Sequence, residues 1–295
     1  MLVRLFAALL VSQSALLACS SEPRSPGSAI VAAGASNTSG GAGSNGSGGA
    51  GSGGGAIAGG GPDLNLDPDA GLGDEAGTGC SHLNIGILGK PGANASSNFQ
   101  QWLVDSGTSV QRIHTTNTEL LTAATLQPFD VVILDWLTRA YSADEAAILA
   151  AWVSAGGGLA SMTGYSNTSS DWHANSLLAP LQVAYGGALL NGPVLSFATH
   201  PVTAGLNAVT FQGGYAVSDL GGSASTRTAI AFLPDPGKTP AGFAIQMQKG
   251  RAIVWGDEWI EFDSEWSTLP QITQFWVQLF TWISPKNKCE LTPPK

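Results

Sequence analysis

Short apolar runs alternate with amphipathic segments along the chain from Leu83 onward. Four of these runs predict strands, at 83–88 (LNIGIL), 110–114 (VQRIH), 129–136 (FDVVILDW) and 158–163 (GLASMT). The run at 129–136 is continuously rich in Val, Ile and Leu, which is typical of a strand covered on both faces. Strands that alternate with helical segments indicate an α/β domain with a largely parallel sheet.

Helical spacing is clearest in two segments. Ser142 and Glu145 form a capping box ahead of an apolar stripe, and a run of glycines ends that helix. A last helix is expected at 269–283, where apolar residues recur on one face at Ile272, Phe275, Trp276, Leu279, Phe280 and Ile283. Shorter helices are expected near 118–126 and around Phe99, Trp102 and Leu103.

The second half of the domain has a less regular pattern. Strands are expected in PVLSF (193–197), TFQGGYAVS (210–218) and TAIAFL (228–233). The runs FAIQMQ and RAIVW are separated by Lys249-Gly250 and predict a late β-hairpin with a tight turn.

The first residues have the pattern of an export signal. One basic residue, Arg4, precedes an apolar stretch that is too short to span a bilayer and ends in LLAC at Cys19. This ending resembles the bacterial lipobox, so residues 1–18 are predicted to be a signal peptide and Cys19 to carry the lipid. The alternative is ordinary secretion. Because Ser20 follows Cys19, we expect anchoring in the cell envelope, at the outer membrane of a Gram-negative bacterium.

Residues 19–79 are dominated by Gly, Ser, Ala, Asn and Pro. Such a segment cannot bury enough apolar surface to offset the entropy of ordering, so it is predicted to be a disordered linker with a reach of roughly 40 Å. The globular domain is then 80–295. A net charge of −9, with no cluster of Lys and Arg, argues against nucleic-acid binding.

The chain has three cysteines. With Cys19 lipidated, Cys80 and Cys289 remain at the two ends of the domain, and such a pair in an exported protein predicts a disulfide. The alternative is two free thiols, although neither cysteine lies in a CxxC or Cys/His sequence that would indicate a metal or redox site.

Several of these pieces follow one another in an order that resembles a known superfamily. FDVVILDW, a capped helix continuing as AAWVSAGGGLASMTGY, then FATHPVTAGL and a hairpin ending RAIVWGDEW are together similar to the class I glutamine amidotransferase-like superfamily. The nearest branch is the non-amidotransferase one that includes trehalose-utilisation-like proteins. This resemblance implies a flavodoxin-like sheet with helices on both faces.

The resemblance also implies where glutaminase residues would lie. An amidotransferase has a cysteine after the strand that follows the capped helix, and a histidine with a nearby glutamate after the late strand. This chain has Ser161-Met162-Thr163 and Gly256-Asp257-Glu258 at those places, so glutaminase chemistry is excluded and no catalytic residue is assigned. Ser161 or Thr163 could replace the cysteine only with an adjacent base.

Ligands of open α/β sheets bind beyond the carboxyl ends of the strands. The predicted strand ends define a candidate ligand rim that consists of Lys90, His114, Asp135, Trp136, Thr163, Tyr165, Asp257, Glu258 and Trp259. Asp257 and Glu258 are adjacent in an extended segment, so at most one of them should face a given pocket. The plainest interpretation is that one caps a loop or pairs with Lys90 or Arg139.

Three kinds of site remain open at this rim. Asp257 or Glu258, with Asp135, could catalyse hydrolysis as a carboxylate pair. A calcium ion could bind the carboxylates of Asp257, Glu258, Glu261, Asp263 and Glu265, but these residues lack the loop spacing of a calcium site. A zinc or iron site would need histidines, and the four histidines at positions 82, 114, 173 and 200 are scattered along the sequence. We therefore predict no metal and no cofactor. The third option is sugar stacking on the aromatic residues Trp136, Tyr165, Trp172, Trp259 and Trp266.

We therefore expect an envelope lipoprotein whose domain acts as a non-catalytic binding or interaction module. Its expected partners are the membrane, through the lipid on Cys19, and a glycan or an envelope protein. The alternative is a carbohydrate-active or other hydrolase that uses Asp257 or Glu258.

Overall fold

The computed structural model describes residues 80–92, 94–164, 172–268 and 270–293. The predicted signal peptide, Cys19, the linker over 19–79 and Tyr165 lie outside these residues. An eight-stranded sheet has the strand order β2-β1-β3-β4-β10-β9-β8-β6, and β5 and β7 form a separate two-stranded sheet. The strands are β1 (Asn84–Leu88), β2 (Ser109–Ile113), β3 (Val131–Leu134), β4 (Gly158–Ser161), β5 (Val183–Asn191), β6 (Ser196–Phe197), β7 (Gln212–Asp219), β8 (Thr226–Phe232), β9 (Pro240–Met247) and β10 (Gly250–Trp255).

The first five strands of the large sheet are parallel. β1 pairs with β2 and β3, and β4 pairs with β3 and β10. The order β2-β1-β3-β4-β10 is the flavodoxin-like order, with β10 in the fifth place. The predicted hairpin joins β9 to β10, with Gly250 opposite Met247, and β8 and β6 extend the sheet with antiparallel pairs. The predicted fold class is therefore confirmed.

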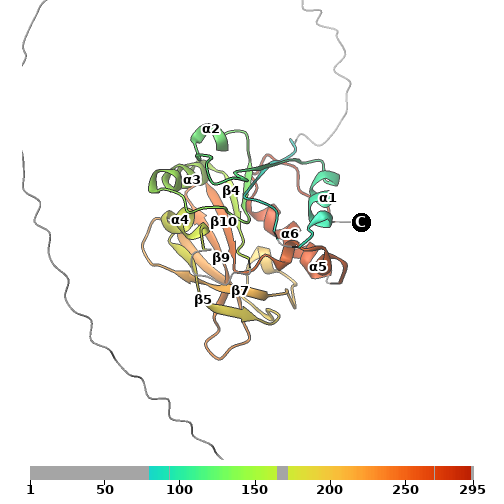
Figure 1. Cartoon of the computed structure of the whole chain (residues 1–295). Coiled ribbons are helices and arrows are strands. Elements are labelled where there is room, and N and C mark those ends of the chain that lie inside the picture. The colour runs from blue at the N-terminus through green and yellow to red at the C-terminus, as the bar shows by residue number, and fades with distance from the viewer. Residues whose placement is uncertain (1–79, 93, 165–171, 269, 294–295) are drawn as a thin grey trace, which may run out of the picture. The chain divides into compact units, whose positions relative to one another are not determined.

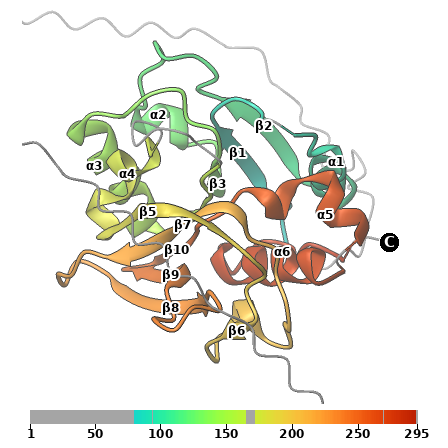
Figure 2. The ribbon, with the colours of Figure 1, turned by 60° about the horizontal axis from the view of Figure 1, so that its bottom comes forward.

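Helices cover both faces of the sheet, as Figures 1 and 2 show. On one face, α6 packs with α1 on the side chains of Val131 and Ile133, and on the other face, α3 and α4 pack on Val132 and Leu134. Successive residues of β3 thus belong to two different cores, which explains why its sequence is continuously apolar. The helices are α1 (Ser97–Asp105), α2 (Ala123–Leu126), α3 (Ala143–Ala155), α4 (Ala174–Leu178), α5 (Asp263–Thr268) and α6 (Pro270–Ile283), with 3-10 helices η2 (Ala179–Leu181), η3 (Pro201–Thr203) and η4 (Trp259–Glu261).

The two best-marked helices are as predicted. The Ser142 hydroxyl accepts a hydrogen bond from the Glu145 N–H, and the Glu145 carboxylate accepts one from the Ser142 N–H, which completes the capping box of α3. Gly156 ends α3 with a φ of 126°, a conformation that favours glycine. The apolar stripe of α6 is fully buried, from Ile272 to Ile283.

The helix predicted near 118–126 is wrong in its first half, because α2 begins only at Ala123. The Glu119 carboxylate accepts hydrogen bonds from the N–H and hydroxyl of Thr116, which holds this segment in a turn. Thr122 then forms its own capping box with Thr125 and starts the helix later. The sequence also gave no sign of β5, which pairs with β7 across one face of the domain.

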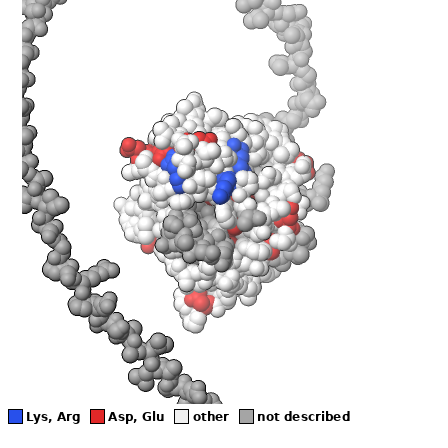
Figure 3. Space-filling view, viewed as in Figure 1, with Lys and Arg blue, Asp and Glu red and all other residues white. Residues whose placement is uncertain are grey.

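The predicted disulfide joins Cys80 to Cys289, which are 209 residues apart in the sequence. Backbone hydrogen bonds between Ser81 and the residues on either side of Lys288 hold the two ends together next to this bond. Among the described residues, no helix is both long enough and apolar enough to cross a membrane. On the face shown in Figure 3, Lys and Arg side chains cover only small areas.

Candidate functional site

The candidate site lies at the carboxyl ends of β1, β3, β4 and β10. The strand order reverses between β1 and β3, and such a point is where open α/β sheets bind ligands. The loops that follow these two strands are joined, because the Lys90 N–H donates to the carbonyl of Trp136 at 3.0 Å. This contact requires glycine at position 89, where φ is 112° and a Cβ atom would lie 2.5 Å from the Trp136 oxygen.

A pocket of about 330 Å³ opens at this switch point, which we call the rim pocket. Four residues of the predicted rim line it, and Ala174 of α4 and the preceding His173 complete the lining. Its volume is at the lower end of the range for small-ligand sites, roughly 300–1,000 Å³. The lining residues are Lys90, Asp135, Trp136, Leu137, Thr138, Met162, Thr163, Gly164, His173 and Ala174.

A second pocket, of about 310 Å³, shares Trp136 with the first, and we call it the amide pocket. Carboxamide side chains come to it from the loop after β1 and from one end of the β5–β7 sheet, where Asn191 pairs with Gln212. The sequence pattern did not predict this sheet as a wall of the site. The lining residues are Asn94, Trp136, Asn191, Gln212, Gly213, Glu258 and Trp259. The indole N–H of Trp136 is buried and makes no hydrogen bond with the described residues.

Asp135 connects the rim pocket to the interior. Its side chain is buried, and its Oδ2 atom accepts a hydrogen bond from the Arg112 guanidinium at 2.6 Å. The same guanidinium also donates to the carbonyl of Gly89. Burial raises the pKa of Asp135, and Arg112 opposes this rise by stabilising the anion.

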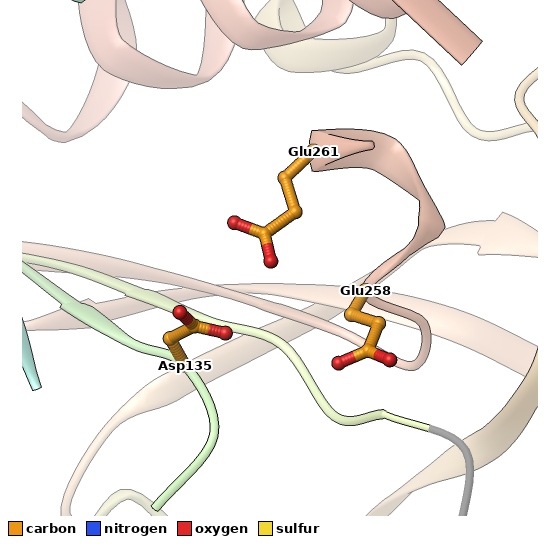
Figure 4. Close-up of side chains that lie close together, drawn as sticks. All are labelled: Asp135, Glu258 and Glu261. Atoms are coloured by element: carbon orange, nitrogen blue, oxygen red, sulfur yellow. The ribbon is translucent and has the colours of Figure 1, made fainter. Parts of the chain in front are cut away.

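Three buried carboxylates converge beside the rim pocket, as Figure 4 shows. Asp135 comes from the end of β3, while Glu258 and Glu261 come from the segment that follows β10. One oxygen of each lies within 4.8 Å of the others. Burial, followed by the charges of Asp135 and Glu258, raises the pKa of Glu261. Gly164 makes room for this cluster, because a Cβ atom there would lie 2.2 Å from the Glu258 carboxylate.

The segment with the two glutamates is held by indole groups. The carbonyl of Ile260 accepts a hydrogen bond from the Trp276 indole at 2.7 Å and from the Trp266 indole at 3.1 Å. Trp276 belongs to α6 and is fully buried, so the apolar helix packed on the sheet also fixes the short helix η4. Glu261 was not among the predicted rim residues. Its only sequence signal was its place among the carboxylates after β10.

Asp257 points away from both pockets. Its carboxylate accepts hydrogen bonds from the backbone N–H groups of Gln212 and Trp259, and its side chain is completely buried. Burial raises the pKa of Asp257 to about 8, although these backbone bonds act in the opposite direction. The two adjacent acidic side chains therefore have different surroundings, since Asp257 caps a loop and Glu258 lines the amide pocket.

The remaining acidic residues of this segment have structural partners. Asp263 accepts hydrogen bonds from Ser97 and from the N–H of Asn98 at the start of α1, and Glu265 accepts one from the Thr210 hydroxyl. The suggested pairing of Arg139 with Asp257 or Glu258 is wrong, because Arg139 forms an ion pair with Glu145 of α3.

The resemblance places a nucleophile near Ser161, and the structure gives this hydroxyl another role. Ser161 accepts a hydrogen bond from the Tyr185 hydroxyl at 2.7 Å, and both side chains are buried. Burial raises the pKa of Tyr185 well above its usual value, so this phenol is no general base. Among the described residues, no histidine is hydrogen-bonded to Ser161 or Thr163, which leaves a serine-type triad without its base.

His114 lines neither pocket. It is 3% exposed, its backbone has a φ of 54°, and its ring stacks on Tyr141 with a centroid separation of 5.9 Å. Burial lowers the pKa of His114. His114 was included in the predicted rim because it directly follows β2. Its packing on Tyr141 turns the side chain away from the pockets. His200 has a local role, since its ring accepts a hydrogen bond from the N–H of Val202.

The aromatic residues divide into two groups. Trp136 and Trp259 line the amide pocket, whereas Trp266 packs on Phe99 and Trp102 in the core, and Trp172 packs edge-on against Tyr215. Lys90 Nζ lies 5.9 Å from the centre of the Trp136 ring, so a cation lies near one face of this indole.

No protein-family model matches the sequence, and no curated protein does. Among solved structures, the chain is similar to the mmIFT52 N-terminal domain, with a TM-score of 0.55, 14% identity, and coverage of 69% of this chain and 99% of that one. It is also similar to the cytoplasmic protein STM1381 from Salmonella typhimurium LT2, with a TM-score of 0.52, 14% identity, and coverage of 69% and 100%.

A glutamine amidotransferase from Thermotoga maritima is also among the similar structures. It is 11% identical over 68% of this chain and 83% of that one, and its TM-score of 0.41 is too low to carry an argument by itself. At these identities the likenesses show the fold alone. They are consistent with the flavodoxin-like α/β fold described above.

Proposed function

We propose that this protein is a non-catalytic binding module of the bacterial cell envelope and that the rim and amide pockets bind a carbohydrate. The lipid on Cys19 would anchor it, and residues 19–79 would serve as its tether. The sequence supports this address through the apolar stretch that ends in LLAC and the Gly/Ser-rich segment that follows.

The observation that carries the carbohydrate proposal is the meeting of two pockets at Trp136. Sugars are bound by stacking on flat aromatic rings and by hydrogen bonds to their hydroxyl groups. Trp136 and Trp259 offer the rings, and Asn191 and Gln212 offer carboxamides beside them. Thr163 and His173 add polar groups on the other side of Trp136.

The absence of a nucleophile with its base, among the described residues, favours binding over turnover. Ser161 is bonded to Tyr185 in the core. Asp257 is bonded to backbone N–H groups and lines neither pocket, so it cannot reach a glycosidic bond from its position.

The alternative hydrolase depends on Glu258, which lines the amide pocket and lies close to Asp135. Two carboxyl groups on either side of a bound sugar are the usual requirement for glycoside hydrolysis. Here both carboxylates are buried in one cluster with Glu261, and Asp135 is paired with Arg112, which fits this requirement poorly.

Binding of labelled protein to an array of bacterial glycans tests the proposal. Trp136→Ala should abolish binding, because it removes the ring that both pockets share. Trp282→Ala is the matched control, since it removes another half-buried indole, which stacks with Arg251 at the amino end of β10. Equal binding by Trp136→Ala and the unaltered chain would overturn the carbohydrate site.

The same glycans distinguish the hydrolase. Release of reducing ends by the unaltered chain, lost in Glu258→Gln, would establish catalysis and overturn the binding-only proposal. Binding without release is the expected result.

A further inference from the structure

The strongest unassigned feature is the group formed by Asp135, Glu258 and Glu261, which we call the carboxylate cluster. Its members are 5%, 2% and 2% exposed, and they come from two loops more than one hundred residues apart in the sequence. Figure 4 shows the three side chains close together, with the carboxyl groups of Asp135 and Glu261 facing each other. Side chains that pack together in a protein interior are usually apolar. The convergence of three buried acids therefore needs an explanation.

The charge around the cluster is unbalanced. If Asp135 and Glu261 are both ionised, the Arg112 guanidinium balances one of these two negative charges. Among the ion pairs of the described residues, none involves Glu261. Buried carboxylates without compensation are strongly unfavourable, so the cluster calls for positive charge.

Unmade hydrogen bonds are a second, separate observation. Asp135 Oδ1 and Glu261 Oε1 are buried, and when both carboxyl groups are ionised neither oxygen has a hydrogen-bond donor among the described residues. Nearly all buried polar atoms in folded proteins are hydrogen-bonded or coordinate an ion. The two oxygens belong to residues that face the same small space, so one bound species can satisfy both.

We propose that the carboxylate cluster binds a divalent cation that prefers hard oxygen ligands, and that Ca²⁺ fits it best. Ca²⁺ binds carboxylate oxygens at about 2.3–2.6 Å, so one ion can span oxygens up to about 5 Å apart. The oxygens of the cluster lie within 4.8 Å of one another. Mg²⁺, with bonds of about 2.0–2.1 Å, spans at most about 4.2 Å and demands near-ideal octahedral geometry, so it tolerates a narrower range of ligand positions than Ca²⁺.

The surroundings allow such an ion to enter and to complete its coordination. Asp135 lines the rim pocket and Glu258 lines the amide pocket, so the cluster is the floor between them. Ca²⁺ takes six to eight oxygen ligands, and water or a ligand hydroxyl in either pocket can supply those that the cluster does not. The proposed cation site does not depend on carbohydrate binding, because the side chains that coordinate the ion belong to the protein.

Isothermal titration of the purified full chain, first stripped with EDTA, tests the proposal with CaCl₂, MgCl₂ and MnCl₂ in turn. We expect one Ca²⁺ per chain, weaker binding of Mg²⁺, and a rise in the melting temperature with Ca²⁺ by mass action. Glu261→Gln and Asp135→Asn, which keep the shape of the side chains, should each abolish the Ca²⁺ signal.

Glu265→Gln is the matched control, because Glu265 is a buried acid of the same segment whose carboxylate accepts from Thr210 and lies outside the cluster. It should bind Ca²⁺ like the unaltered chain. Lack of binding by all three metals, or loss of binding in Glu265→Gln as well, would overturn the cation site and leave shared protons as the compensation. Trp136→Ala should retain Ca²⁺ while losing glycan, so the two proposals can fail separately.

Discussion

Ser161 has a close partner that determines what it can do. Its hydroxyl accepts the Tyr185 O–H in the interior between β4 and β5, where neither group reaches solvent. A serine engaged in this way contributes to the packing of β5 on the sheet. At the place where the resemblance puts a nucleophile, the chain has a structural hydrogen bond instead.

Ser161→Ala should lower the free energy of unfolding by about 1–3 kcal/mol, because the buried Tyr185 hydroxyl loses its acceptor. Urea denaturation measures this loss. The double variant Ser161→Ala/Tyr185→Phe removes both polar groups and should lose less than the sum of the two single changes. Loss of glycan binding in Ser161→Ala without a loss of stability would contradict a structural role.

At this scale, the sequence allowed the rim to be predicted but not the contacts within it. The apolar run before Asp135 and Trp136 marked the end of β3, so their position at the carboxyl edge followed directly. Glu261 was left out of the predicted rim because the helical turn η4 brings it back toward Asp135, and this turn is fixed by the indole groups of Trp266 and Trp276. Such tertiary hydrogen bonds leave no local pattern.

At the scale of elements, α3 shows how a local signal is reinforced by its surroundings. The Glu145 carboxylate closes the capping box and also accepts hydrogen bonds from the Leu121 N–H and from both terminal nitrogens of Arg139. These contacts attach the start of the helix to the loop after β2. Arg139, together with the backbone N–H groups of Ser142 and Leu121, lowers the pKa of Glu145 to about 2.

Glu145→Gln should therefore reduce stability in a pH-dependent way. The pKa of Glu145 is lower in the folded state than its usual 4.5, so the ionised group stabilises the fold fully above about pH 4.5, and this contribution is lost as the pH falls toward 2. Urea denaturation at pH 6 and pH 3 should show a smaller difference between the variant and the unaltered chain at pH 3. Asp144→Asn, an exposed acid of the same turn, is the control. A difference that stays constant with pH would contradict the assignment.

Elements with strong periodicity were predictable, and those shaped by other segments were not. The stripes of α3 and α6 and the apolar run of β3 follow from burial on defined faces. The helix predicted for the segment before α2 was wrong because Thr116 donates hydrogen bonds to Glu119, and this contact prevents a helix. β5 was not predicted because Gly186 and Gly187 weaken its strand pattern, and it becomes a strand through its pairing with β7. This unpredicted strand supplies Asn191 to the amide pocket.

At the scale of the whole molecule, the Cys80–Cys289 bond closes a loop of 209 residues. In the chain-entropy model, such a loop stabilises the folded state by up to about 5 kcal/mol. Cys80→Ser should therefore lower the urea midpoint, and alkylation of the denatured domain should modify two cysteines only after reduction. Two modified cysteines before reduction would contradict the disulfide.

Lipid attachment is a prediction of the same scale. Bacteria that express the chain and grow with a palmitate analogue should label it, and Cys19→Ala should remove the label together with membrane association, because one residue carries the acyl chains. Cys80→Ser should keep the label. Labelling that persists in Cys19→Ala would contradict lipidation at this position.

The same disulfide also determines how the domain bears mechanical force. The chain before Cys80 joins the domain at the amino edge of the sheet, whereas both pockets open at the carboxyl edge. A pull between a molecule held in the pockets and the chain before Cys80 passes through two covalent routes, one along β1 and one through α6 and Cys289. A load applied at Cys80 is therefore shared between β1 and α6.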